Sequence, residues 1–230
     1  MKKQILVLFS AALLLSSCST QIPKSVAYKN FYSEKPLVIL LMPPINKSTN
    51  VESKEYFHST MNIPLANSGY YVIPPFISME ILKKESAYDS ELFIDKPLTE
   101  FGNVFGADLA LFTIIHKWDK SALLAKVTVE IEYIIKSINT SEIIYTRRGE
   151  IIYSTSVSSG SNGMFGVLAD LALSAINTAT TKYVNVARAC NSYTLQDLPA
   201  GKYSPSFGVD GDLMSGKKRF KVRLNSQYKY

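Results

Sequence analysis

The feature that most constrains the fold is an alternation of apolar and polar residues between Val127 and Lys136. It has one exception, Ile134, which is apolar but falls on the otherwise polar side. A period of two predicts a long β-strand with one buried and one wet face. A turn at residues 139–141 and a second long strand from Glu142 to Val157 complete an antiparallel hairpin, in which Arg147 to Gly149 are predicted to form a bulge.

Three shorter apolar segments before this hairpin predict strands of the parallel kind. They are Leu37 to Met42, Tyr70 to Ile73 and Asp108 to Ile115. The first is a continuous apolar run that stops at two prolines, which is typical of a strand buried on both faces. It is the predicted first strand of the core.

Helices are expected between and after these strands. Glu52 to Asn67 has a weak helical pattern that Pro64 must kink, break or restart. Ser78 is a predicted cap of a helix that runs to about Glu85, and Pro97 is predicted to open another. Spacings of three and four among apolar residues predict one alanine-rich helix from Val167 to Cys190.

The resulting fold class is α/β: a mixed sheet of parallel βαβ strands plus a long antiparallel hairpin, packed by helices. The segment Arg219 to Leu224 alternates like an edge strand. We divide the chain into a signal peptide (1–17), a lipid-anchored tether (18–36), an α/β core domain (37–198) and a basic C-terminal extension (199–230).

The N-terminus resembles a bacterial lipoprotein signal. Two lysines precede the apolar run Ile5 to Leu15, whose helix would span only about half of a ~30 Å hydrocarbon core, so it targets the chain without spanning a membrane. Leu15 to Cys18 resembles the lipobox that signal peptidase II cuts before acyl chains are attached to the cysteine. We therefore expect Cys18 to be lipidated. The alternative is an ordinary cleavage site and a soluble periplasmic domain.

The positive charge is concentrated at the C-terminus. The net charge is +6, and removing Lys2 and Lys3 with the signal leaves +4. Residues 210–230 alone carry +4. A charge confined to a tail argues against nucleic acid as a partner. An anionic envelope surface and a plain solvated end both remain open.

Few residues in the sequence suggest a catalytic, metal-binding or phosphate-binding site. His58 and His116 have no second ligand at metal-site spacing, and Cys190 is expected to be a buried, inert thiol outside any disulfide. Glu130 and Glu132 are read as the solvated side of the hairpin in preference to a catalytic pair. Gly160, Gly163 and Gly166 form at most a weak phosphate cradle. We predict that the protein is not an enzyme and that it has no catalytic residue, no metal and no cofactor.

Four segments together resemble a family of uncharacterised bacterial lipoproteins that includes a neisserial vaccine candidate. They are Pro43 to Ser48, Gly69 to Val72, Phe105 to Leu111 and Ser156 to Gly160. The resemblance implies a fold similar to the TolB N-terminal domain and the periplasmic domain of CsgG. It carries no established activity, and the long membrane-spanning hairpins of CsgG are not evident here.

The expected function is therefore that of an outer-membrane-anchored lipoprotein facing the periplasm. It would act by protein-protein contacts in envelope assembly or export, with a CsgG-like lipoprotein among the candidate partners. Ser19, in place of the aspartate that retains lipoproteins in the inner membrane, favours the outer membrane. The alternative is a protein that binds or modifies envelope glycans or peptidoglycan. A homodimer or small ring formed through the helix from Val167 to Cys190, or through the adjoining sheet edge, is a further hypothesis. Its alternative is that the apolar face of this helix covers the chain's own sheet.

Overall fold

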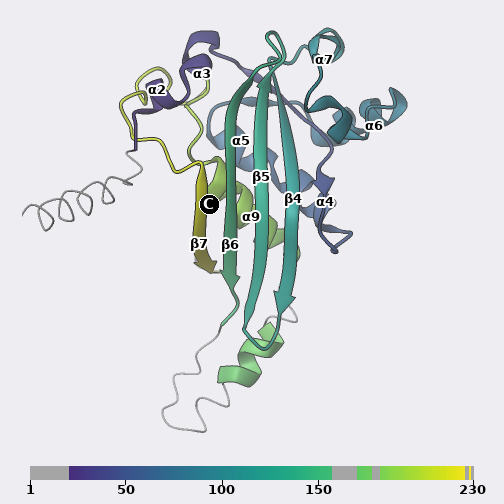
Figure 1. Ribbon diagram of the computed structural model, residues 1–230, viewed down its shortest axis with the longest axis vertical. Coiled ribbons are helices and arrows are strands. Elements are labelled where there is room, and N and C mark those ends of the chain that lie inside the picture. Colours follow the sequence, from purple (N-terminus) through teal and green to yellow (C-terminus); the bar gives the residue numbers. More distant parts are fainter. Residues whose placement is uncertain (1–20, 157–169, 178–181, 226–227, 229–230) are drawn as a thin grey trace, which may run out of the picture.

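The computed structural model describes residues 21–156, 170–177, 182–225 and 228. Its centre is a seven-stranded mixed sheet in the order β3-β1-β4-β5-β6-β7, with the short β2 paired to β4 (Figure 1). The strands are β1 (Val38–Leu41), β2 (Ile45–Asn46), β3 (Tyr71–Val72), β4 (Leu109–Ser121), β5 (Lys126–Ser137), β6 (Ile143–Ser154) and β7 (Arg219–Asn225). The helices are α2 (Lys24–Ala27), α3 (Lys29–Glu34), α4 (Ser53–Thr60), α5 (Asn62–Asn67), α6 (Pro75–Lys84), the 3-10 helix η1 (Ser90–Phe93), α7 (Thr99–Phe105) and α9 (Tyr183–Leu195).

The predicted fold class is confirmed. Strand β1 pairs in parallel with β3 and β4, while β4, β5 and β6 are antiparallel. Residues Ile39, Leu40 and Leu41 of β1 are buried, as expected for a strand covered on both faces. The edge strand at the C-terminus is confirmed as β7, which runs parallel to β6.

The central hairpin is confirmed, but its bulge was misplaced. Residues 147–149 pair in regular register with β5, whereas the register shifts where Ile135 and Lys136 face Tyr145 and Ile143. Gly149 has a different role. A Cβ there would lie 2.3 Å from the ring of Phe220, so the missing side chain lets Phe220 of β7 lie against β6.

Strand β4 is longer than the sequence pattern predicted. It continues through Ser121 and forms a second hairpin with β5, in which Trp118 faces Val129. The polar residues that follow Ile115 look like a loop. They pair nonetheless, because Trp118, which is 3% exposed, buries its ring on the core face.

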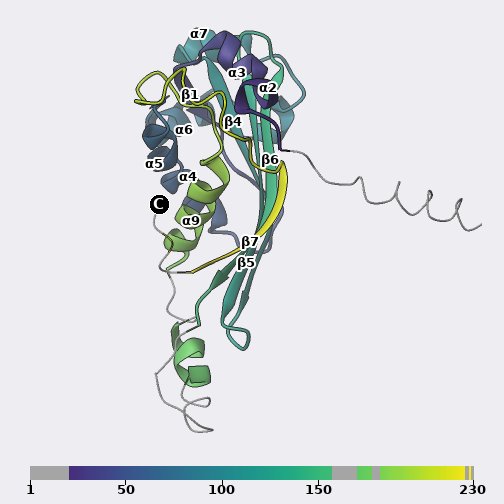
Figure 2. The same cartoon turned by 90° about the vertical axis from the view of Figure 1, so that its left-hand side faces the viewer.

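Helices cover both faces of the sheet, unequally. One core cluster joins the sheet to α4, α5 and α9 along the length of β4, β5 and β6 (Figure 2). A smaller cluster on the opposite face includes Leu82 of α6 and Phe101 of α7. Ile134 belongs to this second cluster, which explains the exception in the alternating pattern. Lys136, predicted to be wet, is buried there and donates to the carbonyls of Ile94 and Lys96.

Prolines set the helix boundaries in this region. Helix α4 ends at Thr60 and α5 restarts at Asn62, with Pro64 in its first turn, as one of the predicted outcomes. Helix α6 begins at Pro75 and not at Ser78, whose hydroxyl donates to the Pro75 carbonyl inside the helix. The proline starts the helix because its fixed φ suits the first helical position. Helix α7 starts at Thr99, two residues after Pro97.

The single helix predicted from Val167 to Cys190 is wrong. Residues 170–177 are helical, Lys182 is extended with ψ 116°, and α9 begins at Tyr183. The apolar spacing continues across this break, so periodicity could not reveal it. In α9 the stripe is core: Val186 and Cys190 are fully buried, so this part is no dimer interface. Residues 160–166, the weak phosphate cradle, lie outside the described residues.

Within the segment predicted as a tether (18–36), the described residues are structured from Pro23 onward. Pro23 pairs with Met214, and helices α2 and α3 follow directly. Tyr28 and Phe31 are buried in the main cluster. Aromatic residues at this spacing bury a large apolar area, and that burial holds the segment against the sheet. The folded part therefore starts well before Leu37.

Candidate functional site

The residues that the sequence singled out lie apart from one another. Cys18 lies outside the described residues. Cys190 is buried in α9, and burial raises the pKa of its thiol far above the ordinary value, so it is unreactive as expected. Within the described part of the chain, no group of three or more His, Cys, Asp or Glu side chains could hold a metal ion.

The polar face of the hairpin carries a row of ion pairs. His116 Nε2 lies 2.7 Å from a carboxylate oxygen of Glu132. Arg148 lies 2.7 Å from Glu130 and 3.6 Å from Glu132. Because Arg148 engages both carboxylates, they behave as part of a partly exposed charge network. This matches the expectation that they form the solvated side of the hairpin.

A groove of about 450 Å³ lies between α4 and α6. Phe76 is 79% exposed and Ile77 is 54% exposed, although both are large apolar side chains. The buried positions of α6 are Ser78 and Leu82, so the opposite side of the helix must face outward. The residues that line the groove are Pro44, Lys54, Glu55, His58, Ser59, Asn62, Pro75, Phe76, Met79, Glu80, Lys83 and Tyr88.

Charged groups surround this apolar patch. The amines of Lys54 and Lys83 lie 5.5 and 5.8 Å from the centre of the Tyr88 ring, and Lys83 also pairs with Glu80 at 3.1 Å. His58 Nε2 lies 3.4 Å from the Pro75 carbonyl and so links the two helices. An apolar centre with a charged rim is the usual anatomy of a protein-binding surface.

His58 should make stability depend on pH. Burial lowers the pKa of His58, although Pro75 and Glu55 oppose the shift. The unfolded chain therefore binds a proton more readily, and stability is lost as the pH falls through the unfolded value of about 6.5. In urea unfolding between about pH 7 and pH 5, the wild type should lose more stability than His58→Gln. Equal losses in both proteins would contradict this role of His58.

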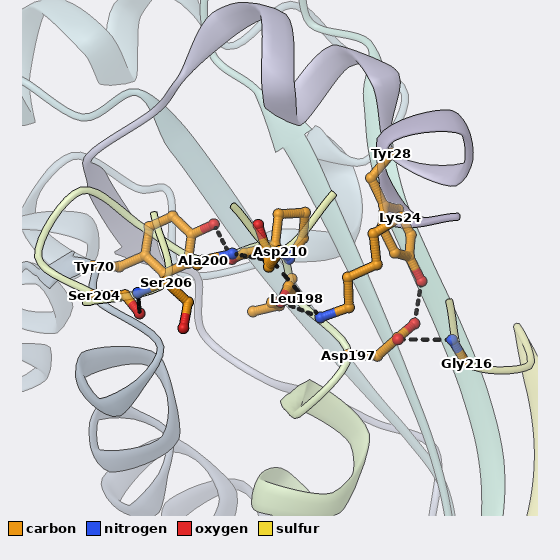
Figure 3. A network of polar contacts seen from close by, with 11 residues as sticks. Lys24, Tyr28, Tyr70, Asp197, Leu198, Ala200, Ser204, Ser206, Asp210 and Gly216 are labelled. Carbon is orange, nitrogen blue, oxygen red and sulfur yellow. Dashed lines mark hydrogen bonds and ion pairs between the residues drawn. The ribbon is translucent and has the colours of Figure 1, made fainter. Parts of the chain in front are cut away.

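A second polar site, which we call the clasp, joins the N-terminal segment to the loops after α9 (Figure 3). Tyr28 donates its hydroxyl proton to Asp197, which also accepts the Gly216 amide at 2.6 Å. Lys24 donates to the Leu198 carbonyl at 3.1 Å and lies 3.9 Å from Asp210. Burial, with the contact to Asp197, raises the pKa of Tyr28 far above its ordinary value.

Backbone pairing reinforces the clasp. Lys24 and Ser25 donate to the carbonyls of Leu213 and Gly211, and Ser215 donates to the carbonyl of Ile22. The clasp therefore fixes the backbone from Ile22 onward. Neither this clasp nor the groove was predicted, because their residues are scattered over the sequence. The pairing of residues 22–28 with residues 197–216 has no periodic signal.

Arg147 completes the same region from the β6 side. Its guanidinium donates to the carbonyls of Tyr193, Thr194 and Lys217, at 3.1, 2.8 and 3.2 Å. It also stacks on the rings of Tyr193 and Phe220, at 5.6 and 4.7 Å from their centres. The carbonyls in the last turn of α9 lack N–H donors from within the helix. The planar Arg147 guanidinium, with its five N–H donors, supplies hydrogen bonds to two of them.

In the part of the chain that the structure describes, every helix is too short or too polar to cross a bilayer.

Comparison with known proteins identifies bacterial lipoproteins that are similar to this chain. The protein NMB1124/NMB1162 of Neisseria meningitidis serogroup B, named as a lipoprotein, is 26% identical over 190 residues, which cover 78% of this chain and 83% of that protein. The crystal structure of lipoprotein GNA1162 from Neisseria meningitidis matches 64% of this chain and all of that one, with 20% identity and a TM-score of 0.47.

Two further solved structures are more distant. The PelC dodecamer from Paraburkholderia phytofirmans matches 63% of this chain and 83% of that one, with 11% identity and a TM-score of 0.38. The LpoB C-terminal domain from Salmonella enterica matches 55% and 96%, with 14% identity and a TM-score of 0.38. The family model for GNA1162-like lipoproteins matches residues 26–202, which is well over half of the sequence. The chain therefore belongs to the GNA1162-like lipoprotein family.

Proposed function

We propose that this protein is anchored in the outer membrane through an acylated Cys18 and binds another envelope protein on its periplasmic side. The anchor is supported by the lipobox-like Leu15 to Cys18 and by membership in a lipoprotein family. The choice of membrane rests on Ser19, which is not the retaining aspartate.

The groove between α4 and α6 carries the proposal of protein binding. Phe76 and Ile77 contribute little to the fold, because most of their surface stays in water. Large aromatic side chains at the centre of a patch supply much of the affinity of protein interfaces when a partner covers them. Charged side chains at the rim, such as Lys54 and Lys83, would orient that partner.

The position of the groove also suits a membrane-anchored protein. Helix α2, which follows the anchor segment, lies toward the β7 edge of the sheet, and α6 lies beyond the opposite edge (Figure 1). A domain held to the bilayer near α2 would thus present α6 to the aqueous compartment. A partner could reach the groove without crossing the membrane surface.

Binding explains the groove better than catalysis. Ser59 and His58 are adjacent on one helix, so their side chains point in different directions. Ser59 donates its hydroxyl proton to the Tyr56 carbonyl, and His58 contacts the Pro75 carbonyl. No nucleophile and base can be assigned from these contacts. The competing function is recognition of an envelope glycan by the same groove, and the test below separates the two.

The test places a photoreactive phenylalanine analogue at position 76 in living cells. We expect irradiation to give one discrete adduct with another envelope protein. The matched control carries the analogue at Leu123, which is 85% exposed at the turn between β4 and β5 and far from α6 (Figure 1). It should give no such adduct. Adding Met79→Lys inside the groove should abolish the adduct at position 76, because a charge would replace part of the apolar lining.

Other products would contradict the proposal in different ways. An adduct that disappears on muramidase digestion would favour the glycan-binding alternative. An adduct between two copies of the chain would favour the homo-oligomer, which stays a prediction for the surface outside α9. If positions 76 and 123 give the same products, the groove has no specific partner.

A further inference from the structure

A second groove, of about 580 Å³, lies beside the clasp and close to the point where the anchor segment enters the fold. We call it the basic groove. It lies between α2 and the chain that leads into β7, and Figure 1 shows these two elements on the same side of the sheet. Its walls are Gln21, Ile22 and Val26 on one side and residues 215–219 on the other.

The charges of this groove are not neutralised by neighbouring side chains. Lys217, Lys218 and Arg219 are exposed, and among the described residues none forms an ion pair with them. Other basic residues nearby differ in this respect. Lys221, two residues further along, pairs with Glu150 at 2.6 Å. The groove thus holds three cations that are free to meet an external anion.

Apolar side chains are exposed next to these cations. Val26 is 63% exposed and Ile22 is 41% exposed, and both line the groove. Leu213 and Met214 are 59% and 58% exposed on the adjoining loop, which pairs with Pro23. Exposed apolar groups mixed with lysine and arginine are typical of surfaces that rest in the interfacial region of a bilayer.

The basic groove lies only a short length of chain away from the proposed anchor at Cys18. The Ile22 carbonyl accepts the Ser215 amide at 2.8 Å, so the backbone is held from this point. Only three residues lie between Cys18 and Ile22, and the four Cα-to-Cα steps of this span reach at most about 14 Å when fully extended. Acyl chains on Cys18 would therefore keep the basic groove within roughly a Debye length or two of the lipid headgroups.

We propose that the basic groove binds the phosphate headgroups of anionic phospholipids in the leaflet that carries the acyl chains of Cys18. This inference rests on the proposed lipidation and adds a fixed orientation to it. Each lysine or arginine near an anionic leaflet favours binding through the surface potential. A soluble phosphate compound fits less well, because the covalent anchor already supplies a high local concentration of headgroups.

The experiment compares lysine reactivity in the mature, lipidated protein on two kinds of vesicle. Mass spectrometry first establishes that Cys18 is acylated. The protein is then reconstituted into vesicles of phosphatidylcholine alone or mixed with phosphatidylglycerol, and its lysines are modified with an uncharged amine reagent. We expect Lys217 and Lys218 to react roughly tenfold more slowly on the anionic vesicles. The physical reason is the electrostatic attraction of Lys217, Lys218 and Arg219 to the anionic leaflet, which protects the amines from the reagent. High salt should remove the difference.

The control is a matched pair of lysines in the same molecule. Lys83 and Lys84 are exposed at the end of α6, beyond the opposite edge of the sheet, and should react at one rate on both vesicles. The variant Lys217→Glu/Lys218→Glu keeps the backbone contacts of these residues. In it, the exposed Lys29 should react equally on both vesicles, whereas Lys83→Glu/Lys84→Glu should leave the slowing at Lys217 unchanged.

Two results would overturn the inference while leaving the anchor intact. One is equal reactivity of Lys217 and Lys218 on both vesicles with Cys18 acylated, which is also the outcome if a protein partner occupies the groove. The other is equal slowing of Lys83 and Lys84, which would indicate a general surface effect. Protein without acyl groups at Cys18 would instead refute the proposed function.

Discussion

Arg147→Ala is expected to lower the free energy of unfolding by about 4 kcal/mol. In the wild type, Arg147 as a whole residue is 5% exposed, and its guanidinium donates hydrogen bonds to three main-chain carbonyls. Thr194 would keep the hydroxyl of Tyr145 as a donor, but the carbonyls of Tyr193 and Lys217 would lose theirs. These two carbonyls are partly buried, so each lost donor costs toward the lower end of about 1 to 3 kcal/mol, and the contacts with two aromatic rings are lost as well.

The adjacent residue provides the control. Arg148→Ala removes the same side chain from the other face of β6, where it is 36% exposed and pairs with Glu130 and Glu132. Surface pairs of this kind contribute about 1 kcal/mol or less. Urea unfolding of both variants measures the contrast. Similar losses in the two would mean that Arg147 does not hold α9 and the β7 segment against β6.

Cys18→Ala is expected to abolish attachment of acyl chains. The motif Leu15 to Cys18 places the thiol where signal peptidase II would expose it, and no other residue of the motif can take its role. A single acyl chain gives only marginal membrane binding, whereas several together anchor a protein stably. Cells that express the variant should accumulate precursor, and the protein should take up no labelled palmitate.

The second cysteine is the matched control for that experiment. Cys190 is buried in α9 and its thiol has a raised pKa, so it cannot accept an acyl group in the folded protein. Cys190→Ala should therefore incorporate as much palmitate as the wild type. Palmitate that persists in Cys18→Ala, or that disappears in Cys190→Ala, would show that the lipid is attached elsewhere.

The sequence determined those parts of the fold that depend on local pattern. Alternation between Val127 and Lys136 was sufficient to predict the first strand of the β5-β6 hairpin, because the side chains of a half-buried strand face the core at every second residue. The run Leu37 to Met42 was sufficient for a strand buried on both faces. The N-terminal motif, together with the four segments that resemble the family, also led to the lipoprotein family without any structure, since such motifs are read as linear sequence.

Only the tertiary structure decided the parts that depend on contacts between distant segments. The residues 18–36 look like a tether because they have no periodicity, yet Tyr28 and Phe31 fill space beside β6 and α9. The break at Lys182 is invisible in the sequence because the apolar spacing continues across it. The α4–α6 groove arises where two separate helices pack together, and the basic groove arises where segments far apart in sequence meet. Such surfaces follow from packing, and a periodic pattern specifies only which face of each element is buried.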